Sequence, residues 1–111
     1  MELTLNITHD DICNGVADDC ARCPVALATI RAFAAAGHTV DRDIWNGPTI
    51  NVSGEEIDVW CDDGSHYRAS QTTAITAFVD AYDAEGGYRA DTYYAKPFVA
   101  LVTFDHVAPA N

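Results

Sequence analysis

The stretch CARCPVALATIRAFAAAG, residues 20–37, constrains the fold of this chain more than any other segment. Proline is favoured at the first position of a helix, because the N–H that it lacks has no helical partner there, so Pro24 predicts a helix start. Gly37 predicts the end of the same helix. Apolar residues recur along it at helical spacing: Leu27, Ile30 and Ala34, with Ala26 and Phe33 widening the stripe. The many alanines favour helix and allow close packing against a sheet.

Apolar patterns elsewhere predict the other elements. Strict alternation in ELTLNIT predicts a half-buried strand over 2–8, and HTVDRDIW and TINVSGEEIDVW predict two or three more strands over 38–60. A second long helix is expected to begin with Ser70 as its cap and to end at Gly86-Gly87. Its buried stripe is predicted to be Ile75, Phe78, Val79 and Tyr82. The segment PFVALVTF predicts the last strand, and CDDGSHYRAS at 61–70 is expected to be a polar loop.

A short helix is predicted between the first strand and the long helix. Thr8 and Asp11 have the spacing of a capping box, in which each side chain bonds the backbone of the other residue. Gly15 is expected to end this helix in the left-handed conformation.

The order of elements predicts an α+β fold. We expect two helices on one face of a mostly antiparallel sheet, in the β-α-β-β-α-β order of the ferredoxin-like split arrangement. With 111 residues, of which 49% are hydrophobic, the chain is expected to form a single domain over 1–111, with 105–111 as a flexible tail.

The charge of the chain excludes several classes of partner. Seventeen acidic residues face six basic ones, for a formal net charge of -11, so direct binding to nucleic acid or to an anionic membrane is disfavoured. No apolar run reaches the length of a membrane span, and the start of the chain lacks the pattern of a signal peptide, which predicts a soluble, cytoplasmic protein. The same acidity allows an alternative role as an acidic DNA mimic that inhibits a DNA-binding protein.

Three interpretations compete for the Cys-x-x-Cys pair of Cys20 and Cys23. A structural zinc site needs a second pair of ligands, for which Cys61 and His66 are the candidates, with Cys13 or His9 as substitutes. A thiol enzyme would use the helix start to favour a thiolate, but Asp18 and Asp19 oppose a negative sulfur. The third interpretation treats Cys23, Cys13 and Cys61 as small buried hydrophobic residues and Cys20 as incidental.

No established catalytic or phosphate-binding pattern occurs in the chain, and paired acids such as Asp41 and Asp43 have no histidine or lysine beside them. We therefore expect no catalysis and no cofactor.

The segment GGYRADTYYAKPF is the candidate contact surface for a protein partner. Tyr88, Tyr93 and Tyr94 lie there beside Arg89 and Lys96, and tyrosine and arginine are enriched at protein interfaces. Packing of Tyr93 or Tyr94 against the sheet is the competing interpretation.

Most of the chain resembles small uncharacterised proteins of actinobacterial phages. The resemblance rests on THDDICNGVADDCARCPVALATIRAF, with its Cys-x-x-Cys-Pro helix start, on AFVDAYD and on the terminal KPFVALVTF. It implies a phage origin, a compact α+β domain and a location in the cytoplasm of the host cell, and it assigns no functional residues.

These observations together predict a small acidic accessory protein that acts by protein–protein interaction with a host or phage partner, without catalysis. A zinc-binding structural module using Cys20 and Cys23 is the first alternative, and the DNA mimic is the second.

Overall fold

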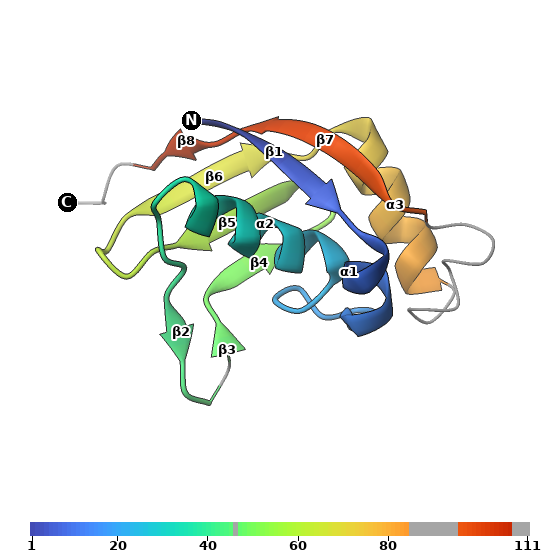
Figure 1. Ribbon diagram of the computed structural model, residues 1–111, viewed down its shortest axis with the longest axis horizontal. Helices are drawn as coiled ribbons and strands as arrows, with labels where there is room; N and C mark the ends of the chain where they lie inside the picture. Colours follow the sequence, from blue (N-terminus) through green and yellow to red (C-terminus); the bar gives the residue numbers. More distant parts are fainter. Residues whose placement is uncertain (46, 85–95, 108–111) are drawn as a thin grey trace.

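The computed structural model describes residues 1–45, 47–84 and 96–107, and these residues form three helices and eight strands (Figure 1). The elements in chain order are β1 (Glu2–Ile7), α1 (His9–Asn14), α2 (Pro24–Ala35), β2 (Arg42–Asp43), β3 (Gly47–Pro48), β4 (Ile50–Val52), β5 (Glu56–Trp60), β6 (His66–Ser70), α3 (Thr73–Ala84), β7 (Phe98–Thr103) and β8 (Asp105–His106). Every strand pairing is antiparallel. The predicted α+β class is confirmed.

The starts of the first two helices are as predicted. Thr8 caps α1 in a full capping box with Asp11, and Cys23 is the N-cap of α2, with Pro24 in its first turn. The prediction for Gly15 is wrong, because this residue has extended backbone angles, φ -71° and ψ 161°. An added Cβ at Gly15 would lie 2.7 Å from the Pro24 ring, so the glycine is needed for close approach of the next helix.

The strands do not form the single sheet of the ferredoxin-like arrangement. β1 pairs only with β7, and β4, β5, β6 and β8 form a separate sheet in that order. Buried Phe104 lies between β7 and β8, so consecutive strands belong to different sheets. The predicted β-α-β-β-α-β order, with two helices on one face of one sheet, is therefore not confirmed, because β1 and β7 form a sheet of their own and β8 joins the edge of the second sheet.

Two segments predicted to lack regular structure contain strands. The expected loop at 61–70 contains β6, and the tail expected at 105–111 begins with β8, which pairs with β6 through Tyr67↔His106 and Arg68↔Asp105. Phe104 N–H donates to the Met1 carbonyl, and the amino terminus donates back to the Phe104 carbonyl. These contacts hold the start of the predicted tail in place, and residues 108–111 lie outside the described part of the chain.

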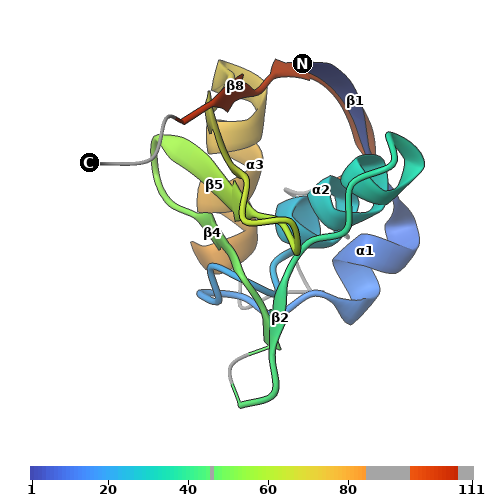
Figure 2. The same cartoon turned by 90° about the vertical axis from the view of Figure 1, so that its left-hand side faces the viewer.

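Helix α2 packs on β1 and β4, inside the curve formed by the two sheets (Figure 2). The predicted stripe is displaced around this helix, since Ala34 is exposed and Leu27 and Ile30 are only half-buried. Ala26 and Phe33 are buried as predicted, and Pro24, Val25, Ala28 and Thr29 are buried with them. Thr29 is accommodated in the core because its hydroxyl donates to the Val25 carbonyl, 2.7 Å away.

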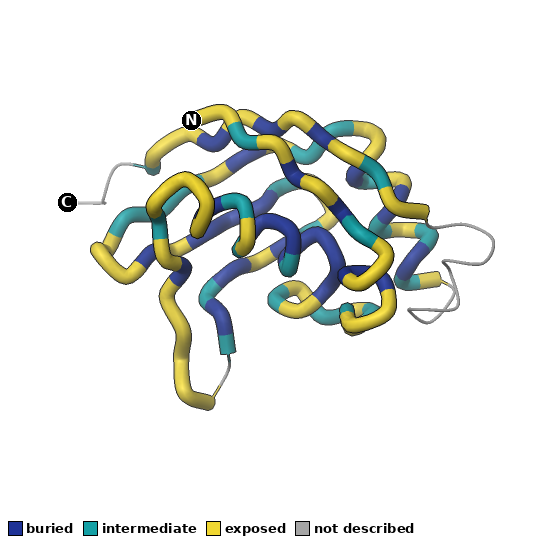
Figure 3. Tube along the Cα trace, in the orientation of Figure 1, coloured by how far each residue is buried: buried dark blue, intermediate teal, exposed yellow. Residues whose placement is uncertain are grey.

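Helix α3 follows the predicted pattern, with Ile75, Phe78 and Tyr82 buried (Figure 3). It begins at Thr73 rather than at Ser70, because Ser70 pairs with Glu56 across β5 and β6. The Tyr82 hydroxyl lies 2.7 Å from the Ile12 carbonyl and 2.9 Å from the Gly15 carbonyl, which ties α3 to the end of α1. Within the described residues, no helix combines the length and the hydropathy that a membrane span requires.

Candidate functional site

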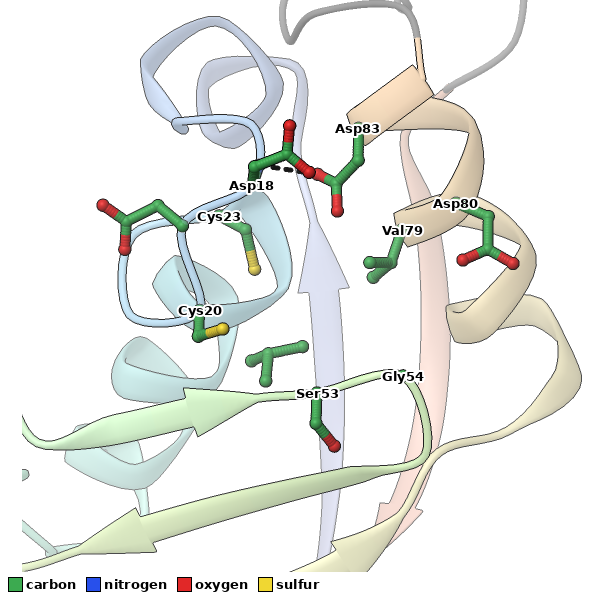
Figure 4. A pocket seen from close by; sticks show the side chains of 10 residues that line it. Asp18, Cys20, Cys23, Ser53, Gly54, Val79, Asp80 and Asp83 are labelled. Carbon is green, nitrogen blue, oxygen red and sulfur yellow. Dashed lines mark hydrogen bonds between the residues drawn. The ribbon is translucent and has the colours of Figure 1, made fainter.

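The Cys-x-x-Cys segment lines a hollow of about 230 Å³ between the loop before α2, the turn joining β4 and β5, and α3 (Figure 4). Cys20 is exposed, whereas Cys23 is 4% exposed. In Figure 4 the two sulfur atoms lie on one side of the hollow, and Asp80 and Asp83 of α3 lie on the other. The hollow therefore combines two thiols with a group of carboxylates.

The acidic residues of this hollow hold the loop in shape. Asp18 has a positive φ of 58°, and its N–H donates to Asp83 Oδ1 at 3.0 Å. Asp19 Oδ1 accepts the N–H groups of Ala21 and Arg22, and its other oxygen lies 3.2 Å from Arg22 Nη1. Carboxylates with such local bonds favour turns, so these acids fix the path of the Cys-x-x-Cys loop.

The environment of Cys23 disfavours a thiolate. Burial raises its pKa to about 11. The N–H groups of Ala26 and Val25 oppose this shift in part, and Asp83 and Cys20 add smaller contributions that raise the pKa. A thiol enzyme requires the opposite shift, because the thiolate is the nucleophile. Cys23 is therefore a protonated, buried thiol at neutral pH.

The residues predicted to complete a zinc site with Cys20 and Cys23 have other surroundings. Cys61 is buried beside a separate hollow that His38 lines, and His66 Nε2 donates to Asp58 Oδ1 at 2.7 Å. Over the described ranges, no three cysteine, histidine or acidic side chains are grouped so that they could hold a metal ion. The predicted burial of Cys23 and Cys61 is confirmed, whereas Cys13 is exposed because Ile12 occupies the buried face of α1.

One acidic residue, Asp11, is buried and paired with Arg31. Asp11 is 4% exposed; burial raises its pKa, but the hydrogen bonds from Arg31 and Thr8 outweigh this effect and lower it. Arg31 Nη2 lies 2.7 Å from Asp11, and the same nitrogen donates to the Asn6 carbonyl. These bonds close a corner between β1, α1 and α2.

The predicted contact residues Tyr88, Tyr93 and Tyr94 lie outside the described residues, so that surface stays a prediction. Two apolar residues that the sequence predicts to lie in a strand are exposed instead. Ile44 and Trp45 are 89% and 86% exposed at the tip of the β2–β3 hairpin. This hairpin projects from the rest of the molecule, and its β2 side is exposed along its length (Figures 1 and 3).

Backbone pairing and one side-chain hydrogen bond hold the described residues on both sides of the hairpin tip. Arg42 pairs with Pro48 and Asp43 with Gly47, and the Trp45 N–H donates to Asp43 Oδ1 at 2.7 Å. Gly47 has a φ of +81°, which favours glycine. These contacts position Ile44 and Trp45 at the end of β2.

The Cys-x-x-Cys loop supports the base of this hairpin. A Cβ added at Gly47 would lie 2.6 Å from Arg22 Nη2, so the Arg22 side chain packs closely on the hairpin backbone. Asp19 holds that guanidinium by its ion pair, and the Cys20 carbonyl accepts the Val52 N–H of β4 at 2.9 Å. The loop that the sequence suggested as a reaction centre thus braces the hairpin and the adjoining sheet.

A second apolar feature lies at the hairpin base. Trp60 is 36% exposed and stacks on the His66 ring, with centroids 4.4 Å apart and an interplanar angle of 12°. It borders a hollow of about 330 Å³ together with Pro48, Ile50 and Ala21. The protruding apolar tip therefore stands beside an apolar recess.

One sequence pattern could have identified this site. Ile44 and Trp45 are adjacent large apolar residues, and the turn signal Asn46-Gly47 follows them directly. Large apolar side chains next to a turn cannot both reach the core, because a turn lies at the surface.

No protein family, no curated protein and no solved structure matches this chain.

Proposed function

We propose that this chain is a small acidic accessory protein that acts by binding another protein and catalyses no reaction. The observation that carries the proposal is the near-complete exposure of Ile44 and Trp45 at the hairpin tip. Exposed apolar surface costs free energy in water, and tryptophan is among the residues that contribute most to protein–protein binding.

The support beneath the tip favours binding. The Asp43–Trp45 hydrogen bond and the packing of Arg22 on Gly47 fix the backbone before any partner arrives. A fixed backbone lowers the entropy lost on association, so more of the interaction energy contributes to affinity. The tip is thus suited to enter a pocket with little rearrangement.

Charge indicates the chemistry of the partner. Asp41 and Asp43 are exposed on the hairpin, and the whole chain carries a formal net charge of -11. We therefore infer a partner protein with an apolar pocket for Trp45 and Ile44 and with basic side chains around that pocket. The resemblance to proteins of actinobacterial phages gives the setting, in which the partner is a host protein or another phage protein.

Site-specific photo-crosslinking tests this proposal. A photoreactive phenylalanine analogue replaces Trp45 in one sample and the exposed Leu101 of β7 in a control sample, and the covalent adducts formed in cells are identified by mass spectrometry. We expect a defined protein to be captured from position 45 and not from position 101.

The captured protein is then purified, and its affinity for the wild-type chain is measured directly. Trp45→Ala should weaken binding at least about tenfold, Leu101→Ser should leave it unchanged, and added salt should weaken it further because of the opposite charges. Equal affinity for the wild-type and Trp45→Ala proteins would refute the proposal.

A further inference from the structure

The four cysteines differ in exposure and in the groups around them. Cys13 and His9 are separated by one turn of α1, and both are exposed. Cys13 Sγ lies 3.3 Å from His9 Nε2, which is within hydrogen-bond reach for a sulfur atom. A thiol in contact with an imidazole nitrogen has a proton acceptor already in place.

The other three thiols lack this arrangement. Cys23 and Cys61 are buried, and burial raises the pKa of each, to about 11 for Cys23. Cys20 is exposed, but no histidine lines the hollow in which it lies, and the carboxylates of Asp18 and Asp19 border it.

We propose that Cys13 is a modification site that forms a mixed disulfide with small neutral or cationic disulfides, with His9 as the proton acceptor. The inference is independent of the proposed binding function, because α1 and the hairpin tip are separate parts of the molecule (Figure 1).

The reaction balances without a further oxidant. The Cys13 S–H proton passes to His9 Nε2, and the Sγ thiolate attacks one sulfur of the disulfide. A new S–S bond forms as the old one breaks, and the electron pair leaves with the departing thiolate. That thiolate takes a proton from the imidazolium or from water, so the cysteine is oxidised while the small disulfide is reduced.

The charge of the protein selects among disulfides. Asp10 is exposed next to His9, and the formal net charge of -11 attracts cations and repels anions. We expect cystamine, a cationic disulfide, to react fastest, neutral 2-hydroxyethyl disulfide to be intermediate, and anionic oxidised glutathione to be slowest.

Intact-mass spectrometry with peptide mapping measures the rate at each cysteine for the folded protein and 2-hydroxyethyl disulfide. Cys13 should be modified first, and Cys13→Ser should remove the fast phase. The matched variant Cys20→Ser, which removes the other exposed thiol, should retain that phase. His9→Gln should slow the Cys13 reaction at least about threefold, because the imidazole that takes up the thiol proton during attack is removed.

The same rates in urea provide the control for structure. Unfolding separates His9 from Cys13, so the wild-type and His9→Gln chains should react at equal rates there. Faster modification of Cys20 than of Cys13 in the folded protein would overturn the proposal. An equal rate for folded wild-type and His9→Gln would also overturn it, and oxidised glutathione reacting as fast as cystamine would remove the charge selection.

Discussion

Two hairpins of this protein carry one tryptophan each and use it in opposite ways. In the β5–β6 hairpin, five residue pairs are in register, and Trp60 stacks on His66 of the facing strand. In the β2–β3 hairpin only two pairs form, and Trp45 projects from the tip with 86% of its surface exposed.

The two hairpins differ in the side-chain contacts that they provide for their tryptophans. Asp58 of β5 accepts from His66 Nε2 at 2.7 Å and from Arg68 Nε at 2.8 Å, which orients the imidazole beneath Trp60. In the shorter hairpin, the Trp45 backbone N–H donates to the Asp43 carboxylate, while its side chain is exposed. One tryptophan therefore completes the fold, and the other is left for a contact outside it.

The largest expected effect comes from removing the carboxylate that organises the longer hairpin. Asp58 is 8% exposed, and Asp58→Ala leaves His66 and Arg68 without their shared acceptor. The free energy of unfolding should fall by about 2 kcal/mol, measured by urea denaturation. Asp62→Ala, which removes an exposed acid of the following turn, should change it by less than about 0.5 kcal/mol. Equal losses for the two variants would show that Asp58 does not organise the hairpin.

The two tryptophans provide the next comparison. Trp60→Ala removes the stack on His66 and one of the side chains that line the recess at the hairpin base. It should lower the free energy of unfolding by about 1–2 kcal/mol. Trp45→Ala should leave stability within about 0.5 kcal/mol of the wild type, because the side chain contacts mainly water. Acrylamide quenching gives an independent readout, since Trp45 in the Trp60→Phe variant should be quenched more than Trp60 in the Trp45→Phe variant. A stability loss for Trp45→Ala as large as for Trp60→Ala would remove the distinction between the hairpins.

A smaller effect is expected from the turn of the exposed hairpin. Gly47→Ala places a Cβ at a φ of +81° and against Arg22, whereas an alanine at Gly54 would meet nothing within 4 Å. The first variant should lose about 1 kcal/mol of stability, and Gly54→Ala should be nearly neutral. Hydrogen exchange should show faster opening of the 41–49 backbone in Gly47→Ala alone. Unchanged exchange there would mean that Arg22 does not brace the hairpin.

The sequence predicted those parts of the fold that depend on neighbouring residues. The Thr8–Asp11 capping box, the start of α2 at Pro24 and the buried face of α3 are all local patterns, and the structure confirms them. The face of α2 that is buried was harder to predict, because an alanine-rich helix is apolar on several sides. Its contacts with β1 and β4 decide which side faces the core.

The sequence did not predict strand β6, because only Tyr67 and Ala69 face inward. They alternate with the polar residues His66, Arg68 and Ser70. Two signals pointed to it nevertheless. Asp63-Gly64 is a typical hairpin turn pair, and the opposite charges of Asp58 and Arg68 lie five residues before and five residues after Asp63. The exposed tip at Ile44 and Trp45 was missed for the related reason that apolar residues were assigned to a strand face.

The smallest effect concerns the acid that closes the β5–β6 turn. The Ser65 N–H donates to Asp63 Oδ1 at 2.8 Å, and this bond, followed by the Ser65 hydroxyl and the charge of His38, lowers the pKa of Asp63 below its usual value. A carboxyl with a lowered folded-state pKa stabilises the fold above its unfolded value, and this contribution is lost as the pH falls through the folded pKa. The turn should therefore loosen only below about pH 4, seen by NMR as a shift of the Ser65 amide that titrates with the Asp63 carboxyl. Asp63→Asn should abolish that titration while Trp60 stays stacked, because the stack depends on Asp58 rather than on the turn. A Ser65 amide shift that persists in Asp63→Asn would assign the titration to another acid.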